Sequence, residues 1–197
     1  DYYITLRKAN FMDEIITKHA QIMDRYDPEH KVSLLVDEWG TWFDVEPGTN
    51  PGFLYQQNTM RDAMVAALDK AGVQVHVHAI GDGAVRGTLD AYEEARAANG
   101  ERDARHTITH VCAITDEDIQ RMADLNVVGA LQFLWMYGDA LCDLERAYIG
   151  DERALAMYPV KKMRDAGIAI TGASDAPVTP FVVLDEIEVG ITRNSPY

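Results

Sequence analysis

The stretch VHVHAIGDG, Val75 to Gly83, decides how the chain is interpreted. Two histidines two positions apart lie in an apolar run that ends in Gly-Asp-Gly. Alternate side chains of a strand point to the same face, so Gln74, His76 and His78 share one face and the intervening valines occupy the other. We therefore predict a buried strand over residues 73–80, with His78 near its carboxyl end.

Similar apolar runs recur along the chain and alternate with helical stripes. We predict further strands over 31–40, 106–113, 127–133 and 168–174. Helices are expected over 2–26, around 60–71 with a stop at Gly72, and from Val85 to an end at Asn99-Gly100. Further helices are expected from the capping box at Thr115 through Met122, from Pro159 to Ala166 with a stop at Gly167, and over 179–191. Residues 135–149 fit either an irregular segment or a helix.

Strands that alternate with helices predict an α/β fold whose parallel sheet is covered by helices. The pattern is that of a partial (β/α)8 TIM-barrel-like sheet with about five strands. Five strands cannot close an eight-stranded barrel, which takes about 250 residues. The chain is therefore expected to be part of a longer protein, an open sheet, or a sheet whose edges partner chains cover.

Composition limits the class of partner. The 197 residues are 47% hydrophobic, enough for one barrel-like unit over 1–197. Eighteen basic and 32 acidic residues give a formal net charge of −14, which repels phosphate backbones and anionic lipid. We expect a small-molecule substrate, no nucleic-acid or membrane partner, and a homo-oligomer that covers open sheet edges. The separated Cys112 and Cys142 form no CxxC pattern, which fits a reducing cytoplasm.

Polar residues follow three of the predicted strands. His78, His110 and the Asp175 of GASDAPV each lie at or just after a strand end. In a barrel these ends face one mouth, and imidazole nitrogen and carboxylate oxygen are ligands of a divalent ion such as zinc. The alternative is structural: strand histidines are commonly core residues, and Asp82 and Asp175 could cap helices. Spacing alone leaves both interpretations open.

Three ordered motifs, VHVHAIGDGAV, RHTITHV and GASDAPVTP, resemble the amidohydrolase superfamily, in particular its N-substituted formamide deformylase-like branch. The resemblance, over about 67–197, implies a metal-bearing (β/α)8 barrel that hydrolyses C–N bonds. It makes His78 and His110 the ligands on the fifth and sixth barrel strands. It makes Asp175 a ligand of the metal or its water, and a general base and then acid.

One family feature is missing. The resemblance calls for a paired His-x-His on the first barrel strand, and nothing here precedes the equivalent of the fourth strand. His76 and His78 have that spacing but match the fifth strand, so His76 is assigned a supporting or structural role. The remaining ligands would hold an ion more weakly, with more open positions.

A second resemblance covers about residues 1–66. The run VDEWGTWFDVEPGTNPGFLYQQNTMRDAM is similar to retaining α-L-arabinofuranosidases, which are also (β/α)8 enzymes. The resemblance makes Glu38, at the end of the first predicted strand, a catalytic nucleophile. Such enzymes need a second carboxyl group about 5–5.5 Å away, and the motif that supplies it is absent. Without that partner, Glu38 is also explained as a solvated or salt-bridged strand-end carboxylate.

Two families thus meet in one chain, with a junction near 64–71. The simplest hypothesis is a recombined or engineered barrel, or a fragment of one, in which Glu38 faces the mouth as a further ligand. We predict a metal-dependent hydrolase of the amidohydrolase type that cleaves an amide or similar C–N bond. We expect its cofactor to be a divalent metal ion, zinc in the first place. The alternatives are an α-L-arabinofuranosidase-type glycoside hydrolase and a non-catalytic chimeric scaffold.

Overall fold

The computed structural model describes residues 11–29, 31–32, 42–43, 55–56 and 61–196. The chain divides into two units, 1–59 and 60–197, and each is described by itself. In the first unit, α2 (Phe11–Tyr26) forms the described part of the helix predicted over 2–26. The two-residue strands β1 (Trp42–Phe43) and β2 (Tyr55–Gln56) pair antiparallel. The strand predicted over 31–40 falls almost wholly outside the described residues.

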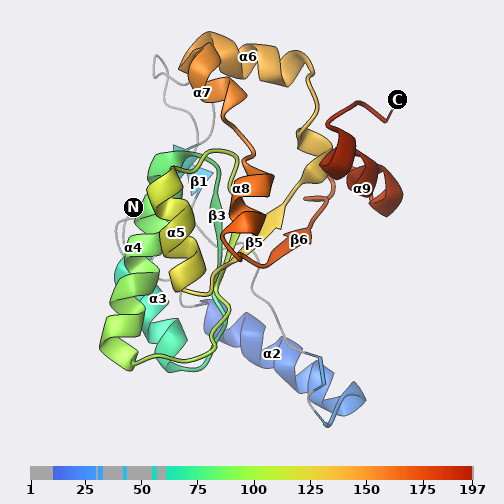
Figure 1. The fold of residues 1–197 in the computed structure, drawn as a ribbon. Coiled ribbons are helices and arrows are strands. Elements are labelled where there is room, and N and C mark those ends of the chain that lie inside the picture. The colour runs from blue at the N-terminus through green and yellow to red at the C-terminus, as the bar shows by residue number, and fades with distance from the viewer. Residues whose placement is uncertain (1–10, 30, 33–41, 44–54, 57–60, 197) are drawn as a thin grey trace. The chain divides into compact units, whose positions relative to one another are not determined.

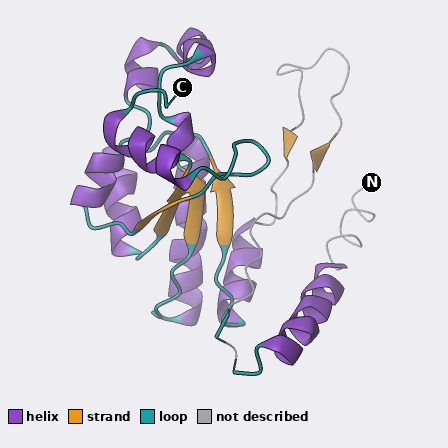
Figure 2. Ribbon diagram, turned by 90° about the vertical axis from the view of Figure 1, so that its right-hand side faces the viewer, coloured by secondary structure: helices purple, strands orange, loops and turns teal. Residues whose placement is uncertain are grey.

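Four parallel strands form the sheet of the second unit (Figures 1 and 2). They are β3 (His76–Ala79), β4 (Thr107–His110), β5 (Val128–Leu131) and β6 (Ile170–Gly172), in that spatial order. Each corresponds to a predicted apolar run. The order follows the sequence, as in a barrel in which every strand pairs with the next one along the chain. The expected fold class, a partial barrel-like parallel sheet, is confirmed.

Helices precede, connect and follow the strands. They are α3 (Arg61–Lys70), α4 (Asp82–Asn99), α5 (Asp116–Asp124), the 3-10 helix η1 (Phe133–Trp135), α6 (Ala140–Ile149), α7 (Asp151–Leu155), α8 (Val160–Asp165) and α9 (Val183–Thr192). Helix α4 contacts α3, β3 and α5, and α5 contacts α8. The predicted glycine stops hold: Gly72, Gly100 and Gly167 adopt φ of 80°, 89° and 89°, a region that glycine enters without steric cost.

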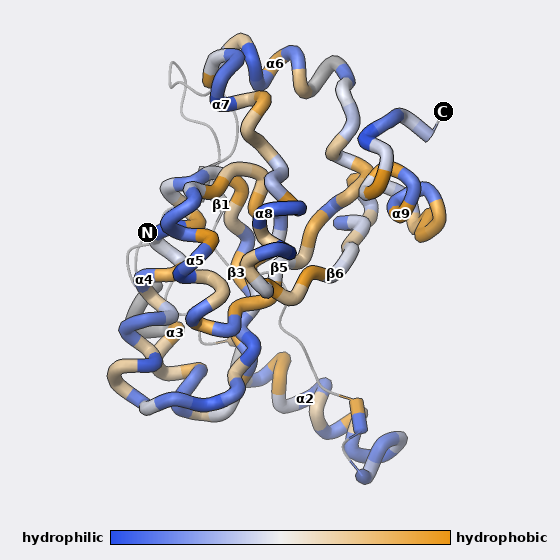
Figure 3. The backbone as a smooth tube through the Cα atoms, viewed as in Figure 1, coloured by the Kyte–Doolittle hydropathy of each residue, from blue (hydrophilic) through white to orange (hydrophobic). Residues whose placement is uncertain are grey.

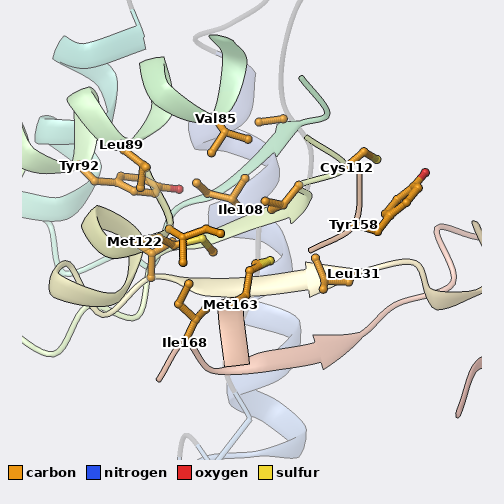
Figure 4. Close-up of a cluster of buried hydrophobic side chains, with 14 of the residues drawn as sticks. Val85, Leu89, Tyr92, Ile108, Cys112, Met122, Leu131, Tyr158, Met163 and Ile168 are labelled. Carbon is orange, nitrogen blue, oxygen red and sulfur yellow. The ribbon is translucent and has the colours of Figure 1, made fainter. Parts of the chain in front are cut away.

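The core lies where α4, α5 and α8 meet the sheet (Figure 4). Leu89, Ile108, Met122 and Met163 have at most 1% of their surface exposed. They come from α4, β4, α5 and α8, so one residue from each element fixes the layers. Burial of side chains of this size stabilises a fold by about 1.5–3 kcal/mol each. This packing holds β3 and β4 in register and so fixes the positions of their carboxyl ends.

Hydropathy is distributed unevenly over the helices (Figure 3). Helix α9 carries exposed apolar side chains at Leu184, Ile187 and Ile191. Thr171 and Gly172 of β6, the last strand in the sheet order, are also exposed. No helix among the described residues is long and apolar enough to cross a membrane.

Candidate metal centre

The carboxyl ends of β3 and β4 bring His78 and His110 into contact. The two strands pair with His78 opposite Thr109 and Ala79 opposite His110. Nδ1 of His78 and Nε2 of His110 lie 3.0 Å apart and share a hydrogen bond. The ring centroids are 4.2 Å apart and the ring planes meet at 67°, an edge-on arrangement. Two imidazole nitrogens therefore face each other at the strand ends.

The backbone at the end of β4 departs from strand geometry. In a regular strand His110 would share the face of Ile108, because side chains alternate, and that face packs into the core. His110 instead has φ of 76°, and Val111 has φ of 46°. Positive φ is uncommon for residues other than glycine, and a β-branched residue rarely adopts it. The turn in the backbone at His110 redirects its ring, which lies against His78.

Two neighbours hold the His110 ring, which is 1% exposed. Its Nδ1 lies 2.7 Å from Oε1 of Gln132, the residue that follows β5. The indole of Trp135 stacks on it with centroids 4.9 Å apart and planes 9° from parallel. His110 is therefore fixed on one edge by a hydrogen bond and on one face by an aromatic ring, whereas His78 is only half-buried.

The facing nitrogens fit two positions of a metal coordination shell. Ligand nitrogens about 2.0–2.1 Å from one tetrahedral zinc ion lie roughly 3.3 Å from each other. The separation of 3.0 Å between His78 Nδ1 and His110 Nε2 is close to that value. Within the described ranges, no set of three His, Cys, Asp or Glu side chains is close enough to hold one ion. Among the residues that the structure describes, the histidine pair is thus assembled without a third such ligand.

Asp175 and Glu38 are placed differently from the histidine pair. Asp175 lies in the turn at 175–178 between β6 and α9, is half-buried, and has φ of 54°. Its carbonyl oxygen accepts a hydrogen bond of 2.8 Å from the backbone nitrogen of Val178. It does not cap α9, whose N-cap is Val182. Glu38 lies outside the described residues.

Asp82, the other acidic residue considered as a cap, is the first residue of α4, and Gly81 is the N-cap. Its carboxylate accepts a hydrogen bond from the backbone nitrogen of Gly83 at 3.0 Å. It also forms an ion pair of 2.9 Å with Arg153 of α7. The first contact lies within the first turn of α4, and the second joins α4 to α7, so both are structural.

His106 belongs to a separate polar cluster at the opposite ends of the strands. The backbone nitrogen of Val75 donates to its Nδ1 at 3.0 Å, so Nε2 carries the proton and donates to Asp69 at 3.1 Å. Tyr92 stacks on the ring at 4.7 Å. Burial lowers the pKa of His106. This histidine is satisfied as a neutral core residue, as the structural interpretation expects.

The carboxylate of Asp69 is also stabilised within this cluster. Burial by itself would raise its pKa, but hydrogen bonds from Asn99 and Arg102 hold the pKa below its usual value. Asp69 is 3% exposed and accepts from Asn99 at 2.8 Å and from Arg102 at 2.7 Å. A small cavity of about 60 Å³ adjoins the cluster. The arrangement ties α3 and α4 to the start of β4.

Sequence reasoning did not identify Gln132, Trp135 or Asp69. A signal existed for Gln132, because it is the polar residue directly after the apolar run VVGAL, near the end of a predicted strand. Gln132 is neither a histidine nor a carboxylate, the residue types from which the ligands were predicted. Trp135 and Asp69 lie 25 and 41 residues from His110, and no local pattern links residues so far apart.

Comparison with known proteins identifies related sequences. The family model described as "Amidohydrolase family" matches residues 4–196. The chain is 30% identical over 195 residues to the putative amidohydrolase YtcJ of Bacillus subtilis, covering 90% of this chain and 36% of that protein. It is 30% identical over 146 residues to N-substituted formamide deformylase of Arthrobacter pascens, covering 72% of this chain and 26% of that protein.

A further relative matches a shorter segment. The chain is 57% identical over 68 residues to an intracellular exo-α-L-arabinofuranosidase of Bacteroides ovatus, covering 34% of this chain and 13% of that protein. Both predicted resemblances are thereby confirmed. The family model nevertheless extends to residue 4, well into the segment that resembles the glycosidase.

A solved structure shares the fold. It is that of an uncharacterized metal-dependent hydrolase from Pyrococcus furiosus, with a TM-score of 0.55 and 24% identity over 84% of this chain and 32% of that one. At this identity the likeness shows the fold. The chain spans little more than a third, or less, of the length of each of these relatives.

Proposed function

The chain belongs to the amidohydrolase family, and on that premise we propose that it is a metal-dependent hydrolase in which His78 and His110 hold a divalent ion. The observation that carries the proposal is the separation of 3.0 Å between His78 Nδ1 and His110 Nε2. Imidazole nitrogens suit zinc, which is the ion we propose. The bond cleaved is an amide or similar C–N bond of a small molecule. The relative that deformylates N-substituted formamides supports this choice.

The chemistry divides between the ion and the side chains. A divalent ion held by the two rings would supply Lewis acidity that activates water and polarises a carbonyl group. His110 is buried and clamped by Gln132 and Trp135, so it presents Nε2 in a fixed direction. Asp175 is assigned the proton transfer: its carboxylate takes a proton from the attacking water and then delivers it to the leaving nitrogen.

The free thiols of Cys112 and Cys142 support a cytoplasmic location for this hydrolase.

Zinc binding by histidine variants tests the proposal. Calorimetric titration of metal-free protein should show one zinc site that His78→Asn and His110→Asn each weaken at least tenfold. His19→Asn is the matched control, because His19 is an exposed residue of α2 whose Nδ1 lies 2.8 Å from the carbonyl oxygen of Ile15. Undiminished zinc binding by the His78→Asn, His110→Asn double variant would contradict the proposal.

Measurement of hydrolytic activity with and without zinc provides a second test. A panel of N-substituted formamides and simple amides should be hydrolysed by the zinc-loaded protein and not after chelation. Turnover that persists in the chelated protein would remove the metal from the mechanism. Zinc binding without turnover on any member of the panel would favour the non-catalytic scaffold.

A second candidate function rests on the 68-residue match to the arabinofuranosidase. In that interpretation Glu38 is the nucleophile of a retaining glycosidase, which requires a second carboxyl group as acid/base. Hydrolysis of an aryl α-L-arabinofuranoside that Glu38→Ala abolishes and chelation does not affect would support this candidate. Absence of arabinoside cleavage in the unmodified chain would remove it.

A further inference from the structure

We propose that Gln132 is a positioning residue, which fixes the tautomer and orientation of His110 so that the lone pair of Nε2 faces His78. This inference rests on the proposed function, because it assigns Gln132 a role in metal binding. Gln132 directly follows β5 and would act on a bound ion only through His110. Three features carry it: the hydrogen bond, the burial of both partners, and the placement of Trp135.

The hydrogen bond selects one tautomer. Oε1 of Gln132 lies 2.7 Å from Nδ1 of His110, and an amide oxygen can only accept. Nδ1 therefore carries the proton of the neutral ring, and Nε2 is left unprotonated. Nε2 is the nitrogen that lies 3.0 Å from His78 Nδ1. In this tautomer Nε2 of His110 accepts from His78 Nδ1–H and can become a ligand once that proton leaves; in the opposite tautomer Nε2 would be a donor with no lone pair for an ion.

Burial makes the selection effective. Gln132 is 2% exposed and His110 is 1% exposed. Water does not compete for the hydrogen bond at such a site, and leaving either group unsatisfied costs about 1–3 kcal/mol. The strands supporting the two residues are neighbours, since β4 pairs with β5 through Ile108 and Gly129. The sheet thus carries the acceptor to the edge of the ring.

The backbone of Gln132 contributes as well. Its carbonyl oxygen accepts a 3.0 Å hydrogen bond from the backbone nitrogen of Trp135 and so closes the turn of η1. That turn places the Trp135 indole on the face of His110, with ring planes 9° apart. One residue therefore fixes the edge of the ring through its side chain and supports its face through its main chain. Substituting the side chain removes the first function and leaves the second.

Three substitutions separate the roles of the amide. Gln132→Glu keeps an acceptor oxygen at the same distance from the backbone and should preserve tautomer and zinc affinity. Gln132→Met keeps length and removes the acceptor, and Gln132→Asn keeps the amide and withdraws it from reach. Partners of metal-ligating histidines typically contribute 10–100-fold in metal affinity. We expect that loss in the Met and Asn variants.

The decisive readout is the tautomer of His110 in metal-free protein. Long-range ¹H–¹⁵N correlation spectra distinguish a protonated from an unprotonated ring nitrogen. The unmodified chain and Gln132→Glu should show protonated Nδ1 and unprotonated Nε2, and Gln132→Met should show both tautomers. Gln120→Met, on the exposed face of α5, is the matched control and should leave the spectrum unchanged. If Gln132→Met does not fold, the spectrum of Gln132→Asn tests the same point and should also show both tautomers.

The outcomes distinguish this inference from the proposed function. Retention of the Nδ1–H tautomer in both the Met and Asn variants, with zinc affinity within threefold of the unmodified chain, would overturn the role of Gln132. If the unmodified chain binds no zinc, the proposed function fails, and a positioning role for Gln132 in metal binding fails with it. If the variants nevertheless lose the Nδ1–H tautomer, Gln132 orients His110 for a structural reason and not for metal binding.

Discussion

His110 and Asp175 share an unusual backbone conformation among the predicted site residues. Their φ angles are 76° and 54°, in the left-handed region. Residues with side chains enter it at a cost of about 1–3 kcal/mol, and such positions cluster at functional sites. Asp, Asn and His tolerate it better than most residues. The residue types at the two strand ends thus suit both the backbone and the proposed chemistry.

Asp175→Asn should lower turnover of the zinc-loaded protein by roughly 10²–10⁴-fold, because the amide cannot accept a proton. Asn tolerates positive φ, so the fold should be kept. Zinc affinity should fall less than turnover, since the histidine pair is intact. Steady-state kinetics with calorimetric zinc titration measures both. Asp185→Asn, at a half-buried residue of α9, is the control; equal turnover in the two variants would remove Asp175 from the mechanism.

His106 should make stability depend on pH. Burial lowers its pKa in the folded protein, whereas the unfolded chain takes up a proton near pH 6.5. The unfolded state thus binds more protons as the pH falls below about 6.5, and the free energy of unfolding should decrease from pH 7.5 to 5.5. The pKa of Asp69 is also lowered, and its contribution is lost only in stronger acid, as the pH falls through the folded-state pKa.

Urea unfolding at several pH values measures this dependence. His106→Gln should show a weaker pH dependence than the unmodified chain, and a free energy of unfolding lower by roughly 1–3 kcal/mol at pH 7.5 because Asp69 loses a partner. His19→Gln, at an exposed site, should keep the unmodified slope. If the free energy of unfolding depends on pH equally in His106→Gln and in the unmodified chain, then His106 has the same pKa in the folded and unfolded states, which would contradict the prediction.

At the scale of single elements, α5 depends on its cap. The Thr115 hydroxyl accepts a hydrogen bond from the backbone nitrogen of Asp118 at 3.2 Å and donates to its carboxylate at 2.8 Å. Asp118 is fully buried and forms ion pairs with Arg86 and Arg121 at 3.0 and 2.9 Å. Despite its burial, hydrogen bonds from Thr115, Arg121 and Arg86 hold its pKa below the usual value. The cap therefore also orients a buried carboxylate.

Thr115→Ala should lower the free energy of unfolding by about 0.5–2 kcal/mol, the usual cost of losing an N-cap. Thr115→Ser keeps the hydroxyl and should recover most of it. Urea denaturation compares the three proteins. An alanine variant as stable as the unmodified chain would show that Arg86 and Arg121 orient Asp118 without the hydroxyl.

The elements show what the sequence can predict. Apolar runs of four to eight residues predicted all four parallel strands, because a short apolar run bounded by turn residues is a local signal. The Thr115 capping box was also correct. Residues 135–149 could not be assigned, since they contain the end of η1, an irregular turn and α6. Pro159 precedes α8 as its N-cap instead of lying in its first turn.

The candidate site was predictable in part. The rule that carboxyl ends of parallel strands meet at one edge brought His78 and His110 together from sequence alone. It could not supply the turn in the backbone at His110 or the role of Gln132, which depend on contacts across strands. The predicted grouping of Asp175 with the histidines is not assembled among the described residues, and Glu38 lies outside them. Both assignments remain predictions.

For the whole molecule, the proposal links metal binding to stability. A ligand that binds only the folded state at a free concentration of 100 times its dissociation constant stabilises it by about 2.7 kcal/mol. Zinc at that concentration should raise the free energy of unfolding by nearly this amount in the unmodified chain. The His78→Asn, His110→Asn double variant should gain less than 1 kcal/mol. Equal stabilisation of both proteins would place the ion elsewhere.

The position of the ion tests the central claim most directly. Crystals of the zinc-loaded chain, measured on both sides of the zinc absorption edge, give an anomalous difference map that locates the ion without reference to the protein. The account predicts a single strong peak about 2.0–2.1 Å from His78 Nδ1 and from His110 Nε2. A peak at surface carboxylates, with the two rings still hydrogen-bonded to each other and no density between β3 and β4, would contradict it.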